Sequence, residues 1–162
     1  MRERSSPHTV TPQLYTDDER ARRDATPWTV VQGVLAPLQF VVFLVSVGLV
    51  LRYLSTGEGY TAATVSVVIK TGVLYLIMVT GAIWEKVVFG QYLFAPAFFW
   101  EDVISFGVIA LHTLYMVGLF ATDWSGQTLM LIALAAYVAY VINAGQFVWK
   151  LRRARLDAGA AV

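Results

Sequence analysis

The segment Ala25–Leu51 reads ATPWTVVQGVLAPLQFVVFLVSVGLVL and contains no Asp, Glu, Lys or Arg in 27 residues. Two further segments are also free of charge, Val103–Thr122 with 20 residues and Trp124–Trp149 with 26. About 20 apolar residues in a helix are enough to cross about 30 Å of hydrocarbon. The sequence therefore predicts an integral membrane protein and excludes a soluble globular enzyme.

The composition of the 162 residues agrees with this class. Hydrophobic residues make up 57% and charged residues 14%, with a mean hydropathy of +0.61, whereas soluble domains carry about 25% charged residues. The chain has no Cys, which excludes disulfides, iron–sulfur clusters and thiolate metal sites. Of the two histidines, His8 and His112, only His112 lies in an apolar segment, so a bis-histidine haem is excluded.

Four membrane-spanning helices are expected, because backbone groups in lipid must be hydrogen-bonded within the chain. They are predicted over Trp28–Leu54, Ala62–Trp84, Pro96–Ala121 and Gln127–Trp149. All five Trp lie at predicted span ends, as in the aromatic belt of membrane proteins. The chain is thus divided into an N-terminal segment over 1–27, an all-α four-helix transmembrane domain over 28–149 and a basic tail over 150–162.

Local signals mark the helix starts. Thr16 and Glu19 have capping-box spacing, which predicts a short helix from Asp17 to about Asp24. Thr26 is a suitable N-cap for the first span, with Pro27 at its first position. Pro37, inside the same span, removes one backbone hydrogen bond and predicts a kink.

The distribution of basic residues predicts the orientation of the helices. Basic residues flank the spans at both ends: Arg2, Arg4, Arg20, Arg22, Arg23, Lys150, Arg152, Arg153 and Arg155. The connections Ser55–Thr61 and Thr122–Gly126 contain no Lys or Arg. We therefore expect both termini and the connection Glu85–Ala95 in the cytoplasm. The basic flanks suit contact with membrane lipid, and no basic face for nucleic acid is visible.

Polar residues inside the spans are the candidate functional residues, because an ionisable group there costs about 2.5–3.5 kcal/mol on insertion scales. The ionisable ones are Lys70, Glu85, Glu101, Asp102 and His112, and their uncharged companions are Gln32, Gln39, Asn143 and Gln146. At about 1.5 Å per residue, six of these residues from all four helices reach one level in the inner leaflet: Gln32, Glu85, Glu101, Asp102, Asn143 and Gln146. This convergence is the strongest functional indication from the residues alone.

Several of these residues also have ordinary structural interpretations. Glu101 and Asp102 can complement a helix dipole, and Glu85 can form an interfacial pair with Lys86. Lys70 can snorkel outward or pair structurally, and His112 can simply pack. Adjacent helical residues point about 100° apart, so we expect only one of Glu101 and Asp102 to face the interior. We favour Glu101, whose face also carries Ser105 and His112.

From Trp84-Glu85-Lys86 through FAPAFFWED (Phe94–Asp102) to ALHT (Ala110–Thr113), the sequence resembles the 3-vinyl bacteriochlorophyllide hydratase family. Three other segments resemble the same family: YTDDERARRDATPW (Tyr15–Trp28), QGVLAPLQFVVF (Gln32–Phe43) and YVINAGQF (Tyr140–Phe147). The similarity runs from about Tyr15 to Arg155.

The resemblance implies a carbon–oxygen lyase that adds water to the 3-vinyl group of a chlorophyllide, giving a 3-(1-hydroxyethyl) group in bacteriochlorophyll biosynthesis. It implies no redox cofactor and no metal beyond the substrate's magnesium. The expected partners are the chlorophyllide macrocycle and membrane lipid. The expected location is the bacterial inner membrane, cytoplasmic or intracytoplasmic, as a multi-pass protein. Contacts with other enzymes of the pathway and self-association stay open.

Hydration needs an acid, a base and a water molecule, and a carboxyl group away from water can stay protonated near neutral pH. We hypothesise that Glu101 donates the proton while Asp102 or Glu85 assists the water. The remaining predicted substrate-binding residues are Gln32, Gln39, Trp100, His112, Asn143 and Gln146. His112 would ligate the substrate's magnesium or relay protons, and the aromatic residues near Trp100 form a belt or wall a flat pocket.

Two other functions are open at this stage. A non-catalytic chlorophyll-binding or photosystem-assembly subunit would explain His112 and the aromatic residues, but it needs no cluster of carboxylates. A small proton-coupled exporter also suits four helices, but its essential acid would lie near the middle of the membrane rather than at one interface.

Overall fold

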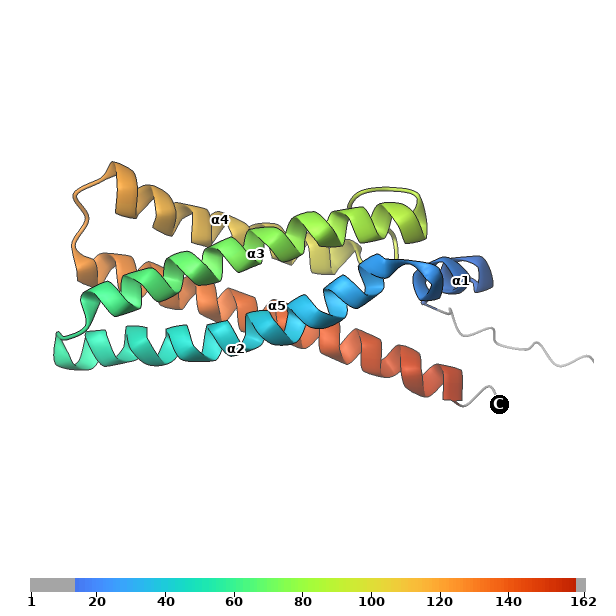
Figure 1. The fold of residues 1–162 in the computed structure, drawn as a ribbon, viewed down its shortest axis with the longest axis horizontal. Helices are drawn as coiled ribbons and strands as arrows, with labels where there is room; N and C mark the ends of the chain where they lie inside the picture. Colours follow the sequence, from blue (N-terminus) through green and yellow to red (C-terminus); the bar gives the residue numbers. More distant parts are fainter. Residues whose placement is uncertain (1–13, 160–162) are drawn as a thin grey trace, which may run out of the picture.

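The computed structural model describes residues 14–159 and is helical along most of that length (Figure 1). The helices are α1 (Asp17–Ala25), α2 (Pro27–Thr56), α3 (Tyr60–Phe89), α4 (Phe99–Ala121) and α5 (Gly126–Gly159). The predicted all-α class is confirmed, and the four helices α2 to α5 are long and apolar enough to cross a membrane. Arg2, Arg4 and His8 lie outside the described residues, as do positions 1–13 of the predicted N-terminal segment and 160–162 of the tail.

Three of the four long helices, α2, α3 and α5, extend past the limits predicted from hydropathy. α3 continues beyond Trp84 to Phe89 and ends at Gly90, whose φ of 85° is left-handed. α5 continues beyond Trp149 to Gly159, whereas α4 begins at Phe99 rather than Pro96. Hydropathy marks the edge of the lipid, but Lys, Arg, Leu and Ala are good helix formers in water as well. As a result, Glu85 lies one turn inside α3 instead of at its end.

The predicted helix starts are confirmed. The Thr16 side chain accepts from the backbone of Glu19, and the Glu19 carboxylate accepts from the backbone of Thr16, which completes the capping box of α1. The Thr26 hydroxyl accepts from the backbone N–H of Trp28 at 3.4 Å, with Pro27 at the first position of α2. α2 continues through Pro37, and its ribbon changes direction within the helix (Figure 1).

The long helices form two hairpins, α2 with α3 and α4 with α5, which pack side by side as an elongated bundle (Figure 1). One end of this bundle carries α1, the C-terminal ends of α3 and α5 and the start of α4 (Figure 1). We call it the α1 end. The connections within the two hairpins lie at the opposite end. Both ends of the described chain are therefore on the same side, as an even number of spans requires.

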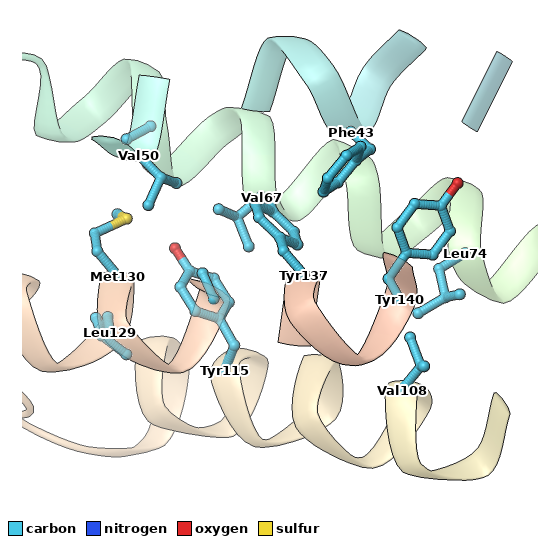
Figure 2. Close-up of a cluster of buried hydrophobic side chains, with 12 residues drawn as sticks. Phe43, Val50, Val67, Leu74, Val108, Tyr115, Leu129, Met130, Tyr137 and Tyr140 are labelled. Carbon is cyan, nitrogen blue, oxygen red and sulfur yellow. The ribbon is translucent and has the colours of Figure 1, made fainter. Parts of the chain in front are cut away.

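The core between the hairpins contains aromatic as well as aliphatic side chains (Figure 2). The ring of Phe43 contacts those of Tyr137 and Tyr140, with centroids 5.4 and 5.1 Å apart. The Tyr137 hydroxyl is hydrogen-bonded to Ser46, which is also bonded to Ser66. These three hydroxyl groups are thus satisfied across helices, as is common where no water reaches.

The α4–α5 hairpin is closed by a tight contact at Gly118. A Cβ atom built there would lie 2.5 Å from the ring of Trp124 and 2.9 Å from the side chain of Leu129. Gly107, on the same helix, has no atom within 4 Å of the corresponding position. Gly118 therefore permits a close approach that a larger residue would prevent.

We predict that Gly118→Ala lowers stability by about 1–3 kcal/mol, because Trp124 must move to admit the methyl group. Gly107→Ala is the matched control and should leave stability unchanged or slightly raised, since Ala favours helix. The measurement is the thermal unfolding midpoint in detergent. Equal midpoints for the two variants would contradict the tight packing at Gly118.

Candidate active site

Two carboxyl groups meet at the α1 end, Glu85 from α3 and Asp102 from α4. The connection between these helices folds back over them. Its backbone N–H at Phe94 donates to Asp102 Oδ2 at 2.7 Å, and the next N–H, at Ala95, donates to Glu85 Oε2 at 3.3 Å. Glu85 is 5% exposed and Asp102 is 3% exposed, so both carboxyl groups are buried beside the same connection. Two buried carboxyl groups at one site can share one proton.

Glu101 is also buried, but it faces a different helix. Lys150 Nζ on α5 donates to Glu101 Oε2 at 2.6 Å, forming an ion pair. The same ammonium group lies 5.1 Å from the centroid of the Phe98 ring. The expectation that only one of the adjacent acids faces the interior is therefore wrong. Both are buried because α3 covers Asp102 while α5 covers Glu101.

The predicted amide side chains occupy separate positions in the bundle. Asn143 Nδ2 donates to Ser105 Oγ at 2.7 Å, one turn along α4 from Glu101. Among the described residues, no partner reaches Asn143 Oδ1 or Gln146 Oε1. Gln32 instead joins α2 to α3 by donating to Thr80 Oγ1 at 2.8 Å. Asn143 and Gln146 thus offer buried acceptors, while Gln32 is already engaged.

A hydrophobic cluster, mostly of aromatic residues, packs at the α1 end, and we call it the aromatic cluster. Its buried members are Tyr15, Val88 and Phe98, with Trp84, Phe89 and Phe147 packed around them. The ring of Tyr15 stacks on that of Phe89 with centroids 5.8 Å apart. Burial raises the pKa of the Tyr15 hydroxyl above its ordinary value, and Arg23 opposes this shift. Since the unperturbed value is already near 10, Tyr15 stays neutral and packs as an apolar ring.

Helix α1 is attached to this end of the bundle by hydrogen bonds. Arg22 Nε donates to the carbonyl of Val88 at 2.8 Å, in the last turn of α3. The Thr29 hydroxyl donates to the carbonyl of Arg23 at 2.6 Å and accepts from Trp84 Nε1 at 2.9 Å. A cation at the C-terminal end of a helix is electrostatically favourable. These contacts join α1 to the helix that carries Glu85.

Trp100 and Gln39 do not join the carboxyl groups. Trp100 is 67% exposed and lies edge-on to Phe99 at the outer surface of α4. Gln39 is buried one turn along α2 from Phe43, and its Oε1 has no hydrogen-bond partner among the described residues. Neither residue belongs to the group of six that was predicted to share one level in the inner leaflet.

A second polar group lies inside the bundle and consists of Lys70 and His112. Both side chains are completely buried, so the snorkelling interpretation of Lys70 is wrong. Lys70 Nζ lies 3.8 Å from the ring centroid of Tyr140, and no hydrogen bond to it occurs within the described part of the chain. His112 Nδ1 is 2.8 Å from the carbonyl of Val108, which can only accept. The proton of a neutral imidazole is therefore on Nδ1, and Nε2 presents an unpartnered lone pair.

These contacts offer no metal centre. Across residues 14–159, no group of three or more His, Asp and Glu side chains is arranged to hold a metal ion. The polar residues at the α1 end can instead exchange protons. They combine the buried carboxyl pair Glu85 and Asp102 with the ion pair of Glu101 and Lys150 and with the unpartnered amide oxygens of Asn143 and Gln146.

Buried Lys70 and half-buried Lys150 give opposite predictions for stability. Lys70→Met removes an unpaired polar group at similar volume and should leave stability unchanged or raise it by about 1–3 kcal/mol. Lys150→Met leaves Glu101 without its partner and should lower stability by about 1–3 kcal/mol. Thermal unfolding in the same detergent compares them. A large loss of stability in Lys70→Met would show that Lys70 has a partner or that its contact with Tyr140 outweighs desolvation.

Comparisons with known proteins cover almost the whole chain. A family model described as 2-vinyl bacteriochlorophyllide hydratase matches residues 15–153. A Cereibacter sphaeroides protein of that name is 71% identical over 157 residues, which cover 97% of this chain and 98% of the relative. A Rhodobacter capsulatus protein of the same name is 72% identical over 147 residues, covering 91% of this chain and 85% of the relative. No solved structure matches the chain.

Proposed function

Because the chain belongs to the 2-vinyl bacteriochlorophyllide hydratase family, we propose that Glu85 and Asp102 add water to the vinyl group of its substrate. The protein is a hydratase of bacteriochlorophyll biosynthesis that acts on vinyl bacteriochlorophyllide. The names 2-vinyl and 3-vinyl refer to the same substituent of the macrocycle. Family membership over nearly the full chain favours this activity over a pigment-binding subunit or an exporter.

The contact that supports the role of the pair is the hydrogen bonding of both carboxyl groups to consecutive amides. The protonated member of the pair gives its proton to the terminal vinyl carbon, which becomes a methyl group. The positive charge left on the inner carbon spreads into the macrocycle. Water attacks that carbon, and the ionised carboxylate takes the proton that the water loses. The product is a 1-hydroxyethyl group, and the pair holds one proton before and after the reaction.

Glu101 has a different role in this proposal from the one favoured on sequence alone. Its carboxylate is in an ion pair with Lys150, and an ionised carboxylate cannot donate a proton. Its negative charge, next to Asp102 in the chain, can instead stabilise the cationic intermediate. We therefore assign the proton donor to the pair Glu85–Asp102 and an electrostatic role to Glu101.

The remaining polar residues have supporting roles. The unpartnered acceptors Asn143 Oδ1 and Gln146 Oε1 are suited to hold water for the reaction, and Gln32 braces α2 against α3. The Nε2 lone pair of His112 suits a proton relay. Ligation of the substrate's magnesium by His112 would require the macrocycle to enter a core where this histidine is completely covered.

We place the α1 end on the cytoplasmic side of the bacterial inner membrane, with both termini there. Seven of the ten described Lys and Arg residues belong to α1 or to the end of α5, namely Arg20, Arg22, Arg23, Lys150, Arg152, Arg153 and Arg155, whereas Arg52 lies near the opposite end of the bundle. This distribution follows the positive-inside rule. The substrate is an amphipathic macrocycle with a propionate, and a site near this interface lets its acid group stay among the headgroups.

We predict that Glu85→Gln and Asp102→Asn each lower hydration at least about 100-fold, the usual contribution of general acid–base catalysis. Membranes with each variant are incubated with 3-vinyl bacteriochlorophyllide. Loss of vinyl conjugation shifts the red absorption band to shorter wavelength. Glu58→Gln, in the exposed loop at the opposite end, is the matched control and should keep full activity.

Glu101→Gln should reduce the rate less than either pair variant, because the proton donor and acceptor remain. Full activity in both Glu85→Gln and Asp102→Asn, at wild-type protein levels, would remove the pair from the mechanism. A Glu101→Gln variant that alone loses activity would return the donor role to Glu101.

A further inference from the structure

Phe94 has a backbone conformation that its residue type disfavours. Its φ of 60° is left-handed, and it is the one residue other than glycine with positive φ in the described part of the chain. A side chain with a Cβ is unfavourable in this region, at a cost of about 1–3 kcal/mol. Glycine would adopt the same conformation without that cost. The strained position therefore suggests that the Phe94 side chain has a use.

The backbone of Phe94 serves the carboxyl pair directly. Its N–H donates to Asp102 and the N–H of Ala95 donates to Glu85. Successive amides next to a left-handed residue can converge on one side and form a concave site for negatively charged oxygen. The conformation of Phe94 therefore positions the two side chains that we assign to the reaction.

The ring of Phe94 belongs to an aromatic surface. It stacks on Phe106 with centroids 5.5 Å apart and planes at 12°. It also lies against Phe99, with centroids 5.7 Å apart. All three rings are about 40% exposed, and Phe99 and Phe106 are seven residues apart on one face of α4. We call Phe94, Phe99 and Phe106 the aromatic face.

Contact with lipid explains an exposed aromatic ring in general, but it does not require a strained phenylalanine. A leucine elsewhere on α4 would contact lipid equally well. In this structure, one residue supplies both an exposed flat ring and an amide bonded to a buried acid. A substrate with a flat macrocycle and a reactive substituent requires such an arrangement, because the surface that binds the macrocycle must lie next to the groups that react with the substituent.

We propose that the aromatic face binds one face of the bacteriochlorophyllide macrocycle, and that Phe94 positions the vinyl group against Glu85 and Asp102. The placement rests on the proposed function of the pair. Aromatic rings stack on a planar conjugated system with a gain of about 0.5–1.5 kcal/mol for each pair. The macrocycle then lies at the lipid-exposed side of α4, and the bundle does not need to open to admit it.

Binding is tested with an unreactive analogue whose vinyl group is replaced by ethyl, by titration of its absorption with purified protein in detergent. Phe94→Leu and Phe106→Leu each keep an apolar side chain but remove a flat ring. Each should raise the Kd about three- to tenfold. Phe120→Leu, which removes a more exposed ring from the same helix near its other end, is the matched control and should bind like wild type.

Positioning is tested with Phe94→Gly and the vinyl substrate. Glycine relieves the strain, so the unfolding midpoint should be unchanged or higher. The two amides are then held less rigidly, and kcat should fall as well as KM rising. Phe106→Leu, which leaves the connection intact, should change KM with little effect on kcat.

Wild-type affinity for the analogue in both Phe94→Leu and Phe106→Leu would overturn the binding surface. A wild-type kcat in Phe94→Gly would overturn the positioning role. If wild-type protein binds the analogue through the aromatic face but hydrates no vinyl substrate, the proposed function of the pair fails while the binding surface stands.

Discussion

Two consecutive backbone amides hold the carboxyl groups of Glu85 and Asp102 at a point where apolar helices leave little water to solvate them. A buried polar group without a hydrogen bond costs several kcal/mol, so the acids need these donors to be tolerated. The donors come from the connection between α3 and α4, in which Phe94 has a left-handed φ of 60°. The same residue thus carries an amide bonded to Asp102 and a partly exposed ring.

The rest of the fold maintains this arrangement. The two hairpins deliver one acid each, because α3 ends and α4 begins at the same end of the bundle. Helix α1 and the aromatic cluster cover that end, and Arg22 ties α1 to the last turn of α3. Lys150 forms an ion pair with Glu101, so the third buried acid also has a partner. The four long helices and α1 thus support a buried polar site at the α1 end of the bundle.

The overall fold could be predicted from the sequence, because long uncharged segments and capping residues are local signals. That Glu85 and Asp102 lie at the same end of the bundle could also be predicted, since depth follows from position along a helix. The burial of both Glu101 and Asp102 could not be predicted, because it depends on which helix lies on each side of α4. Asp102 lies with Glu85 of α3, and Glu101 faces α5. Lys150 was missed because hydropathy ends the fourth span at Trp149, whereas the helix continues. The strain at Phe94 has no sequence signal, since phenylalanine is not a residue that favours positive φ.

The most direct test of this account is an experimental structure of the protein with the unreactive ethyl analogue bound. The distance to measure joins the ethyl carbons to the carboxyl oxygens of Glu85 and Asp102. If the pair and the aromatic face act as proposed, the ethyl carbons will be in van der Waals contact with these carboxyl oxygens, and the macrocycle will lie over Phe94 and Phe106. A macrocycle bound elsewhere, with its magnesium on His112 or its ethyl group far from both acids, would contradict the account.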